Sequence, residues 1–261
     1  MNKQIHTISS LQYDLTNAGI QSGDVLLVHS SMKSLGEVDG GADSVFRALQ
    51  NTVTEKGLLI FPSFSDKTVT EEHPDFDPEK TPAWTGILPE LFRQKAGVRR
   101  SLHPFHSLAV WGAEAEAFVA GHENFDTAFN RESPWGKMLE RNAKTLLIGV
   151  DLTSATFLHA VEEWCNVPVL SREPVIRYIL KKNGNRKCRT IHWHTGAHSE
   201  NFFRAEQPLL KYGAMTKCRI GNAECILLDC RKTLECMTPI LRGNPLFFAH
   251  NESCHYDGSN Q

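Results

Sequence analysis

DVLLVHSSMKSLGEVDGGADSVFRAL, residues 24–49, joins an apolar run to a polar, glycine-rich loop and an amphipathic segment. Residues 24–28 are typical of a buried strand of a parallel sheet. His29, Ser30 and Ser31 follow, and beyond three glycines the apolar residues recur at helical spacing. Strand, loop and helix in this order indicate an α/β fold, whose ligands bind beyond the carboxyl ends of strands. The loop alone fits a structural turn as well as a phosphate cradle, because neither GxGxxG nor GxxxxGK[ST] occurs.

The same pattern recurs as far as residue 165. Further strands are predicted at 58–61, 107–112 and 145–150, and helices at 9–18 (capped by Ser9 or Ser10), 86–94, 113–120, 133–141 and 151–165. Repeated strand–loop–helix units predict a layered α/β/α domain. Residues 66–84 lack periodicity and are predicted to form a long acidic loop, either solvated or part of a site.

Beyond residue 167 the pattern changes. Strands are predicted at 175–180 and 189–193 around an Asn-Gly-Asn turn, followed by a helix at 201–212 and a strand at 222–230. We predict one domain over residues 1–261, in which residues 170–261 form a smaller, more divergent part containing β-structure. The polar tail from residue 251 is expected to fray.

Composition argues against several classes of protein. A net charge of −2 with 22% charged residues does not suit a general nucleic-acid binder. The first residues lack the apolar core of a signal peptide, and no run reaches the roughly 20 apolar residues of a membrane span. Seven cysteines without a CxxC pair favour reduced thiols. We therefore expect a cytoplasmic protein that binds neither membrane nor nucleic acid.

Residues 151–165 carry a histidine with two carboxylates at helical spacing. Glu162 and Glu163 follow His159 at i+3 and i+4, so either can contact the imidazole on one helix face. Such a pair suits a general base, because histidine titrates near neutral pH and an anion orients it. A surface histidine among ordinary helix charges fits the same pattern, and the pattern does not decide which glutamate is the partner.

A second group of histidines lies in HWHTGAH, where His192 and His194 would share one face of a strand. An H-x-H pair can form half of a zinc site. No spaced carboxylate or second histidine pair completes it, so a polar edge or a substrate-contacting strand is the favoured interpretation and no metal is expected. Cys165, Cys225 and Cys230 lie in apolar stretches and are interpreted as structural thiols.

Taken together, six stretches resemble the aminoglycoside 3-N-acetyltransferase family. They are LLVHSSMKSLGEVDGGADSV (26–45), GLLIFPSFS (57–65), FDPEKTPAWTGILPELFR (76–93), GVRRSLHPFHSLAVWG (97–112), ESPWGKMLE (132–140) and LLIGVDLTSATFLHAVEE (146–163). The resemblance implies an α/β fold distinct from the GNAT acetyltransferases. It also implies acetyl-CoA as cosubstrate and acetylation of the 3-amino group of 2-deoxystreptamine antibiotics, an antibiotic-resistance activity.

The resemblance also assigns residues. His159 stands at the family's catalytic histidine in TxLHxxE and Glu162 at its glutamate, which implies direct transfer with histidine as general base. The residues expected at CoA are His29, Ser30, Ser31, Arg100, Ser101 and His103. Those expected at the acceptor are Ser65, Asp66, Glu132 and His194.

Two alternatives stay open. IHWHTGAHS lacks the acidic residues that some members carry there, and Arg131 adds a cation near the expected acceptor side. The acceptor could instead be a biosynthetic amino sugar or sugar nucleotide, or the chain could be a non-catalytic protein that binds CoA or another ligand. The expected partners are an acyl-CoA and a small amino-sugar acceptor, and the expected state is a monomer or homodimer.

Overall fold

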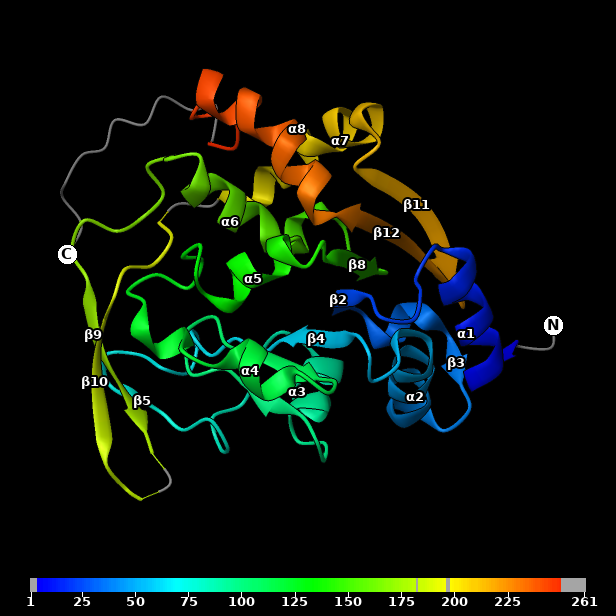
Figure 1. The fold of residues 1–261 in the computed structure, drawn as a ribbon, viewed down its shortest axis with the longest axis horizontal. Coiled ribbons are helices and arrows are strands. Elements are labelled where there is room, and N and C mark those ends of the chain that lie inside the picture. Colours follow the sequence, from blue (N-terminus) through cyan, green and yellow to red (C-terminus); the bar gives the residue numbers. More distant parts are fainter. Residues whose placement is uncertain (1–3, 182, 196–197, 250–261) are drawn as a thin grey trace.

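A seven-stranded sheet forms the centre of the structure, a computed structural model that describes residues 4–181, 183–195 and 198–249 (Figure 1). The strand order is β11-β12-β8-β2-β4-β7-β6. The strands are β2 (Val25–Ser30), β4 (Leu58–Pro62), β6 (Arg99–Arg100), β7 (Leu108–Trp111), β8 (Lys144–Ile148), β11 (Met215–Ile220) and β12 (Ala223–Asp229). The central strands β8, β2 and β4 are parallel, and antiparallel strands flank them on both sides.

Both faces of this sheet are covered by helices. Leu27 lies in one apolar cluster, whereas Leu26 and Val28 lie in the other, as the period of two in a strand requires. The cluster around Leu26 includes apolar residues of α1 (Ile8–Asn17), α2 (Gly41–Val53) and α3 (Ile87–Arg93). The cluster around Leu27 includes those of α4 (Ala115–Val119), α5 (Pro134–Glu140), α6 (Phe157–Trp164), α7 (Glu206–Tyr212) and α8 (Cys230–Gly243). The predicted layered α/β/α class is therefore confirmed.

Two smaller sheets complete the fold. In one, β10 (Arg186–Ile191) pairs with β9 (Val175–Leu180), which pairs with β5 (Asp75–Phe76). Figure 1 shows this hairpin at the opposite end of the molecule from α1. In the other, β1 (Ile5–His6) pairs with β3 (Glu37–Val38). The predicted long loop thus contributes the short strand β5, which anchors the loop to the hairpin.

Several boundaries differ from those predicted. Thr7, not Ser9 or Ser10, caps α1, and its side chain and that of Ser10 form a reciprocal capping box. The predicted strand at 189–193 is β10, which ends at Ile191, so His192 and His194 lie beyond the strand. Residues 151–165 contain a 3₁₀ turn, η3 (Leu152–Ser154), before α6.

Beyond residue 195 the elements are more numerous than predicted. The helix expected at 201–212 divides into a 3₁₀ segment, η4 (His198–Ala205), and α7. The strand β11 and the helix α8 were not predicted. The tail from residue 251 lies outside the described residues. Within the described part of the chain, the helices are all too short or too polar to cross a membrane.

Candidate active site

The centre of the site is a hydrogen-bonded pair on α6. Leu158, Ala160 and Val161 are buried in the core, and His159 and Glu162 lie one turn apart. His159 Nδ1 is 2.8 Å from Glu162 Oε2, and the two side chains are 17% and 0% exposed. Because a carboxylate only accepts hydrogen bonds, Nδ1 carries the ring proton and leaves the lone pair of Nε2 available. Glu162 rather than Glu163 is therefore the partner of His159.

A second histidine holds the other oxygen of Glu162. His198 Nδ1 donates to Oε1 at 2.6 Å. Burial acts to raise the pKa of Glu162, but the hydrogen bonds from His159 and His198 outweigh it and leave that pKa below its ordinary value. The buried carboxylate is thus charged and fixes two imidazole rings at once.

Glu163 and His194 form a second pair beside the first. His194 Nε2 is 2.7 Å from Glu163 Oε1, and Thr127 donates to the other oxygen of Glu163 at 2.8 Å. Burial raises the pKa of Glu163 to about 7 and lowers that of His194 well below its ordinary value. His194 Nδ1 lies 2.9 Å from His159 Nδ1 and so joins the two pairs. We call the set of His159, Glu162, Glu163, His194 and His198 the histidine–glutamate cluster.

Backbone contacts place His194 against α6. His194 forms an isolated antiparallel bridge with Leu170. On either side of it, Ser171 N donates to Trp193 O at 2.8 Å and Thr195 N donates to Val169 O at 2.7 Å. The segment after β10 therefore runs along the chain that leaves α6, and this explains how residues 31 to 35 positions apart meet.

A cavity of about 450 Å³ opens beside the cluster. His159, His194 and His106 form part of its wall, and the carboxylates Asp66 and Glu71 form another part. Burial lowers the pKa of His106 to about 4, so this ring is neutral near pH 7. A different cavity of about 510 Å³ lies at α1 and the turn between β11 and β12, and of the described residues that line it none belongs to the cluster. The smaller cavity is therefore the candidate acceptor site.

The carboxyl end of β2 carries two buried polar atoms that lack a partner. His29 Nε2 and Ser30 Oγ form no hydrogen bond with any described residue. Burial lowers the pKa of His29 to about 3, which keeps its ring neutral. Ser31 caps the 3₁₀ turn η1 (Met32–Leu35), and its backbone N–H donates to Ile148 O at 2.9 Å. Since buried polar groups are normally satisfied, the two unpaired atoms make this end of β2 a candidate ligand-contact position.

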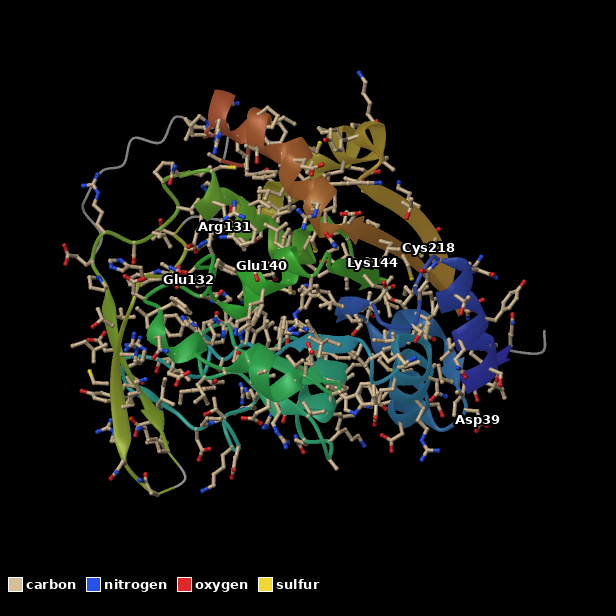
Figure 2. The ribbon with its side chains drawn as sticks, viewed as in Figure 1. Asp39, Arg131, Glu132, Glu140, Lys144 and Cys218 are labelled. Atoms are coloured by element: carbon tan, nitrogen blue, oxygen red, sulfur yellow. The ribbon has the colours of Figure 1, made fainter. Side chains whose placement is uncertain are left out.

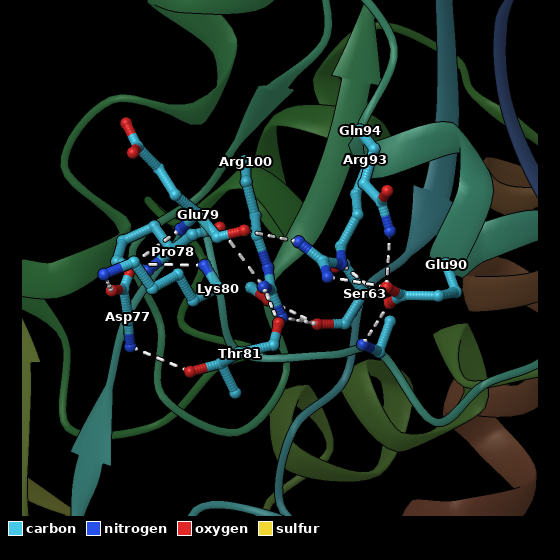
Figure 3. Close-up of polar contacts among 12 residues, drawn as sticks. Ser63, Asp77, Pro78, Glu79, Lys80, Thr81, Glu90, Arg93, Gln94 and Arg100 are labelled. Atoms are coloured by element: carbon cyan, nitrogen blue, oxygen red, sulfur yellow. Dashed lines mark hydrogen bonds and ion pairs between the residues drawn. The ribbon is translucent and has the colours of Figure 1, made fainter.

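Arg100 is bound to the protein itself (Figure 3). Its guanidinium donates to the backbone carbonyls of Ser63, Pro78 and Thr81, at 2.8 Å in the case of Ser63. Burial lowers its pKa to about 9. These contacts give Arg100 a role in joining the long loop to the end of β4. Its predicted contact with CoA stays a prediction.

Ser101 and His103 are also turned inward. Ser101 Oγ accepts from Leu108 N and lies 2.8 Å from His122 Nδ1, and all three residues are buried. His103 is 1% exposed, and its Nδ1 accepts from His106 N at 3.1 Å. His103 thus supports the backbone at His106, and its Nε2 is buried without a partner among the described residues. The contact of Ser101 and of His103 with CoA stays a prediction.

The residues predicted at the acceptor separate into two groups. Asp66 and His194 line the cavity together with His159. Ser65 is buried and donates to Pro104 O at 2.7 Å, so its hydroxyl is already used within the protein. Glu132 is exposed near the start of α5, where Figure 2 labels it together with Arg131. Contacts of Ser65 and Glu132 with an acceptor stay predictions.

Sequence reasoning missed part of the site. It did not assign roles to His106 or His198, and it named Glu163 only as an alternative partner of His159. His194 and His198 are only four residues apart, which was a signal that both could contact the same helix, as they do with α6. The position of His106 in RSLHPFHS was a second signal, because it lies in the connection between the paired strands β6 and β7.

The chain matches a known protein family. The family model described as aminoglycoside 3-N-acetyltransferase matches residues 27–242. The chain is 35% identical over 176 residues to the aminoglycoside N(3')-acetyltransferase-like protein YokD of Bacillus subtilis (strain 168). That alignment covers 60% of this chain and 64% of the Bacillus protein, which is less than two thirds of its length.

Solved structures match over most of both chains. The binary complex of AAC-IIIb with CoASH superimposes with a TM-score of 0.82 at 26% identity and covers 92% of this chain and 97% of that one. A histidine-to-alanine mutant of AAC(3)-IVa in complex with a gentamicin gives 0.83 at 27% identity and covers 96% and 93%. These likenesses confirm the predicted fold and the resemblance stated from sequence, and with the matching model they show that the chain belongs to the aminoglycoside 3-N-acetyltransferase family.

Proposed function

We propose that this protein transfers an acetyl group from acetyl-CoA to an amino group of an aminoglycoside, with His159 as general base. The observation that carries the proposal is the His159–Glu162 pair, because it leaves Nε2 of His159 with a free lone pair at a cavity that also bears carboxylates. Membership of the family and the CoA complex of a relative support the same reaction.

The chemistry follows from the position of the protons. An acceptor amine is protonated near neutral pH and must lose a proton before it can attack a thioester. That first proton leaves to solvent; as the N–C bond forms, Nε2 of His159 takes a second proton from the nitrogen, and the charged Glu162 stabilises the imidazolium. The C–S bond then breaks, and the imidazolium returns the proton to the departing thiolate. The transfer is direct and needs no acyl-enzyme.

The charge around the cavity favours a cationic acceptor. Asp66 and Glu71 line it. Arg177 also lines it and donates to the carbonyls of Val69 and Ile176, and it keeps its positive charge, so the two carboxylates exceed the guanidinium by one charge. Carboxylates in a recess attract ammonium groups. An aminoglycoside therefore fits the cavity better than an anionic sugar nucleotide.

The acetyl donor fits the carboxyl end of β2. His29 Nε2 and Ser30 Oγ are buried and unpaired among the described residues, so a ligand that bonds to them relieves the cost of leaving two polar atoms unsatisfied. Acetyl-CoA presents carbonyl, amide and phosphate oxygens, all of which accept from a hydroxyl or an imidazole N–H. We assign His29, Ser30 and Ser31 to this site.

The proposal is tested by following free-thiol release from acetyl-CoA with a panel of acceptors. The panel contains 2-deoxystreptamine aminoglycosides, a neutral amino sugar and an anionic amino-sugar nucleotide. Turnover confined to the aminoglycosides is expected. Turnover of the nucleotide alone would overturn the acceptor assignment, and acetyl-CoA binding without any turnover would identify a non-catalytic relative.

A further inference from the structure

We propose that His159, Glu162 and His194 form a binding site for Zn²⁺, and that the bound ion switches off acetyl transfer. The ligand atoms are Nδ1 of His159, Oε2 of Glu162 and Nδ1 of His194. These three residues each offer a ligand atom within 4.8 Å of the others. Two imidazole nitrogens and a carboxylate with a fourth position open to water is a common ligand set for zinc.

Two of the three separations suit a tetrahedral ion after a small movement, and the third, between the ligand atoms of Glu162 and His194, is within 4.8 Å. His159 Nδ1 is 2.9 Å from His194 Nδ1 and 2.8 Å from Glu162 Oε2. Ligands at about 2.0–2.1 Å from a tetrahedral ion lie about 3.3 Å from each other. Two of the contacts therefore need to lengthen by a few tenths of an ångström, which side-chain rotation on α6 and in the segment after β10 can supply.

Further residues hold the ligands as the outer residues of metal sites do. His194 turns Nδ1 to the centre while its Nε2–H donates to Glu163 at 2.7 Å, and Thr127 in turn holds Glu163. The second oxygen of Glu162 accepts from His198 at 2.6 Å. A carboxylate behind a ligating histidine fixes its tautomer and raises its basicity. A chance meeting of polar side chains does not require this second layer, so the arrangement points to a built site.

The site is accessible to an ion from the cavity, which also has room for a water molecule as the fourth ligand. His159 and His194 line the cavity of about 450 Å³, and their side chains are 17% and 11% exposed. The rings of Phe129 and Phe202 pack against these histidines, with centroids 5.1 Å from His194 and 4.7 Å from His159. The aromatic rings shield the ligands from bulk water on one side, and on the other side water from the cavity would be the fourth ligand.

Zinc at this position would remove the general base. In a neutral imidazole only one nitrogen carries a proton. When Nδ1 of His159 binds the ion, the ring proton moves to Nε2, which then has no lone pair to accept a proton from the acceptor. The ion also places positive charge beside the cavity and repels a cationic acceptor. The inhibition of acetyl transfer rests on the proposed function, whereas the binding of the metal ion does not.

The binding test is a titration of the metal-free, full-length protein with Co²⁺, followed by displacement with Zn²⁺. One equivalent of Co²⁺ should give the visible bands of a four- or five-coordinate site without thiolate charge transfer. His194→Ala should abolish the bands, and Glu163→Gln should weaken binding about 10- to 100-fold while keeping an acceptor for the ring N–H. His192→Ala is the matched control, because this neighbouring ring contacts Ser171 O instead.

Acetyl transfer is then measured with and without Zn²⁺ and after chelation. The expected result is inhibition by about one equivalent that a chelator reverses. Absence of the bands, or equal binding by wild type and His194→Ala, would overturn the site. Normal transfer in protein saturated with Zn²⁺ would overturn the inhibition. Metal binding in a protein that turns over no acceptor would instead count against the proposed function and leave the metal site standing.

Discussion

The replacement Glu162→Gln tests how the base is held. It keeps the size of a fully buried side chain but removes its charge. The carboxylate accepts from His159 at 2.8 Å and from His198 at 2.6 Å, whereas an amide has one oxygen to accept with. One imidazole must therefore change tautomer or lose its partner. In addition, the imidazolium that forms on His159 during the reaction loses its counter-charge.

The size of the effect follows from these contacts. A hydrogen bond to a charged group contributes about 1.5–3 kcal/mol, and loss of that amount in the transition state lowers kcat about 10- to 150-fold. The assay is thiol release at saturating acetyl-CoA and aminoglycoside. Glu163→Gln is the control, because its carboxylate contacts His194 and should have a smaller effect on kcat. A Glu162→Gln enzyme that keeps kcat within about threefold of wild type, with an unchanged melting temperature, would refute the reasoning.

Three further predictions concern stability and the loops. Burial lowers the pKa of five histidines below the unfolded value of 6.5, to about 3 in His29 and His122, about 4 in His106 and well below 6.5 in His103 and His194. The unfolded chain therefore binds more protons below pH 6.5 than the folded chain does. Urea unfolding between pH 7 and 5 should show the free energy of unfolding falling as the pH falls, by up to about 1.4 kcal/mol per pH unit for each histidine. A flat profile would contradict this. Gly149→Ala should lower the free energy of unfolding by about 1–3 kcal/mol or more, because φ is +62° and the new Cβ would lie 2.2 Å from Cβ of Ser34. Gly213→Ala, with open space around it, should lower it less. Equal losses of stability in urea unfolding would show that the contact with Ser34 is unimportant. Arg100→Gln should lower the melting temperature and leave KM for acetyl-CoA within about threefold of wild type, because the guanidinium donates to backbone carbonyls. A large rise in KM with unchanged stability would instead support the predicted contact with CoA.

The first two thirds of the fold could be predicted because local signals agree with the tertiary structure there. The run beginning at Val25 is apolar because both faces of β2 are covered. Ser133 followed by Pro134 predicts the start of α5 because a capping hydroxyl and a fixed φ favour a first turn, and the structure has both. These features depend on residues close in sequence.

The last third of the fold was harder to predict from the sequence because its helices and strands are half exposed. The strand β11 has the burial pattern of an edge strand, with only Met215 and Ile220 buried, so its sequence MTKCRI resembles a polar loop. The hairpin strand β10 likewise carries Arg186, Lys187 and Arg189, and the prediction began it three residues too late. An edge strand needs apolar residues only on its covered face.

Contacts between residues of the candidate site were predictable only where the residues share one helix. His159 and Glu162 lie three positions apart, so helical geometry alone brings them together. His194 and His198 reach the same place through the bridge to Leu170, 35 and 36 positions from their partners. No local pattern contains such a contact. The bond from Arg100 to the carbonyl of Ser63 likewise joins residues that no local pattern relates.

The most direct test of the account is the effect of His159→Ala on turnover and binding measured in the same preparation. Thiol release with acetyl-CoA and an aminoglycoside gives kcat, and calorimetry gives Kd for each ligand. We predict that kcat falls about 10²- to 10⁴-fold while both Kd values stay within about threefold of wild type. A variant that keeps its turnover would contradict the assignment of His159 as the general base.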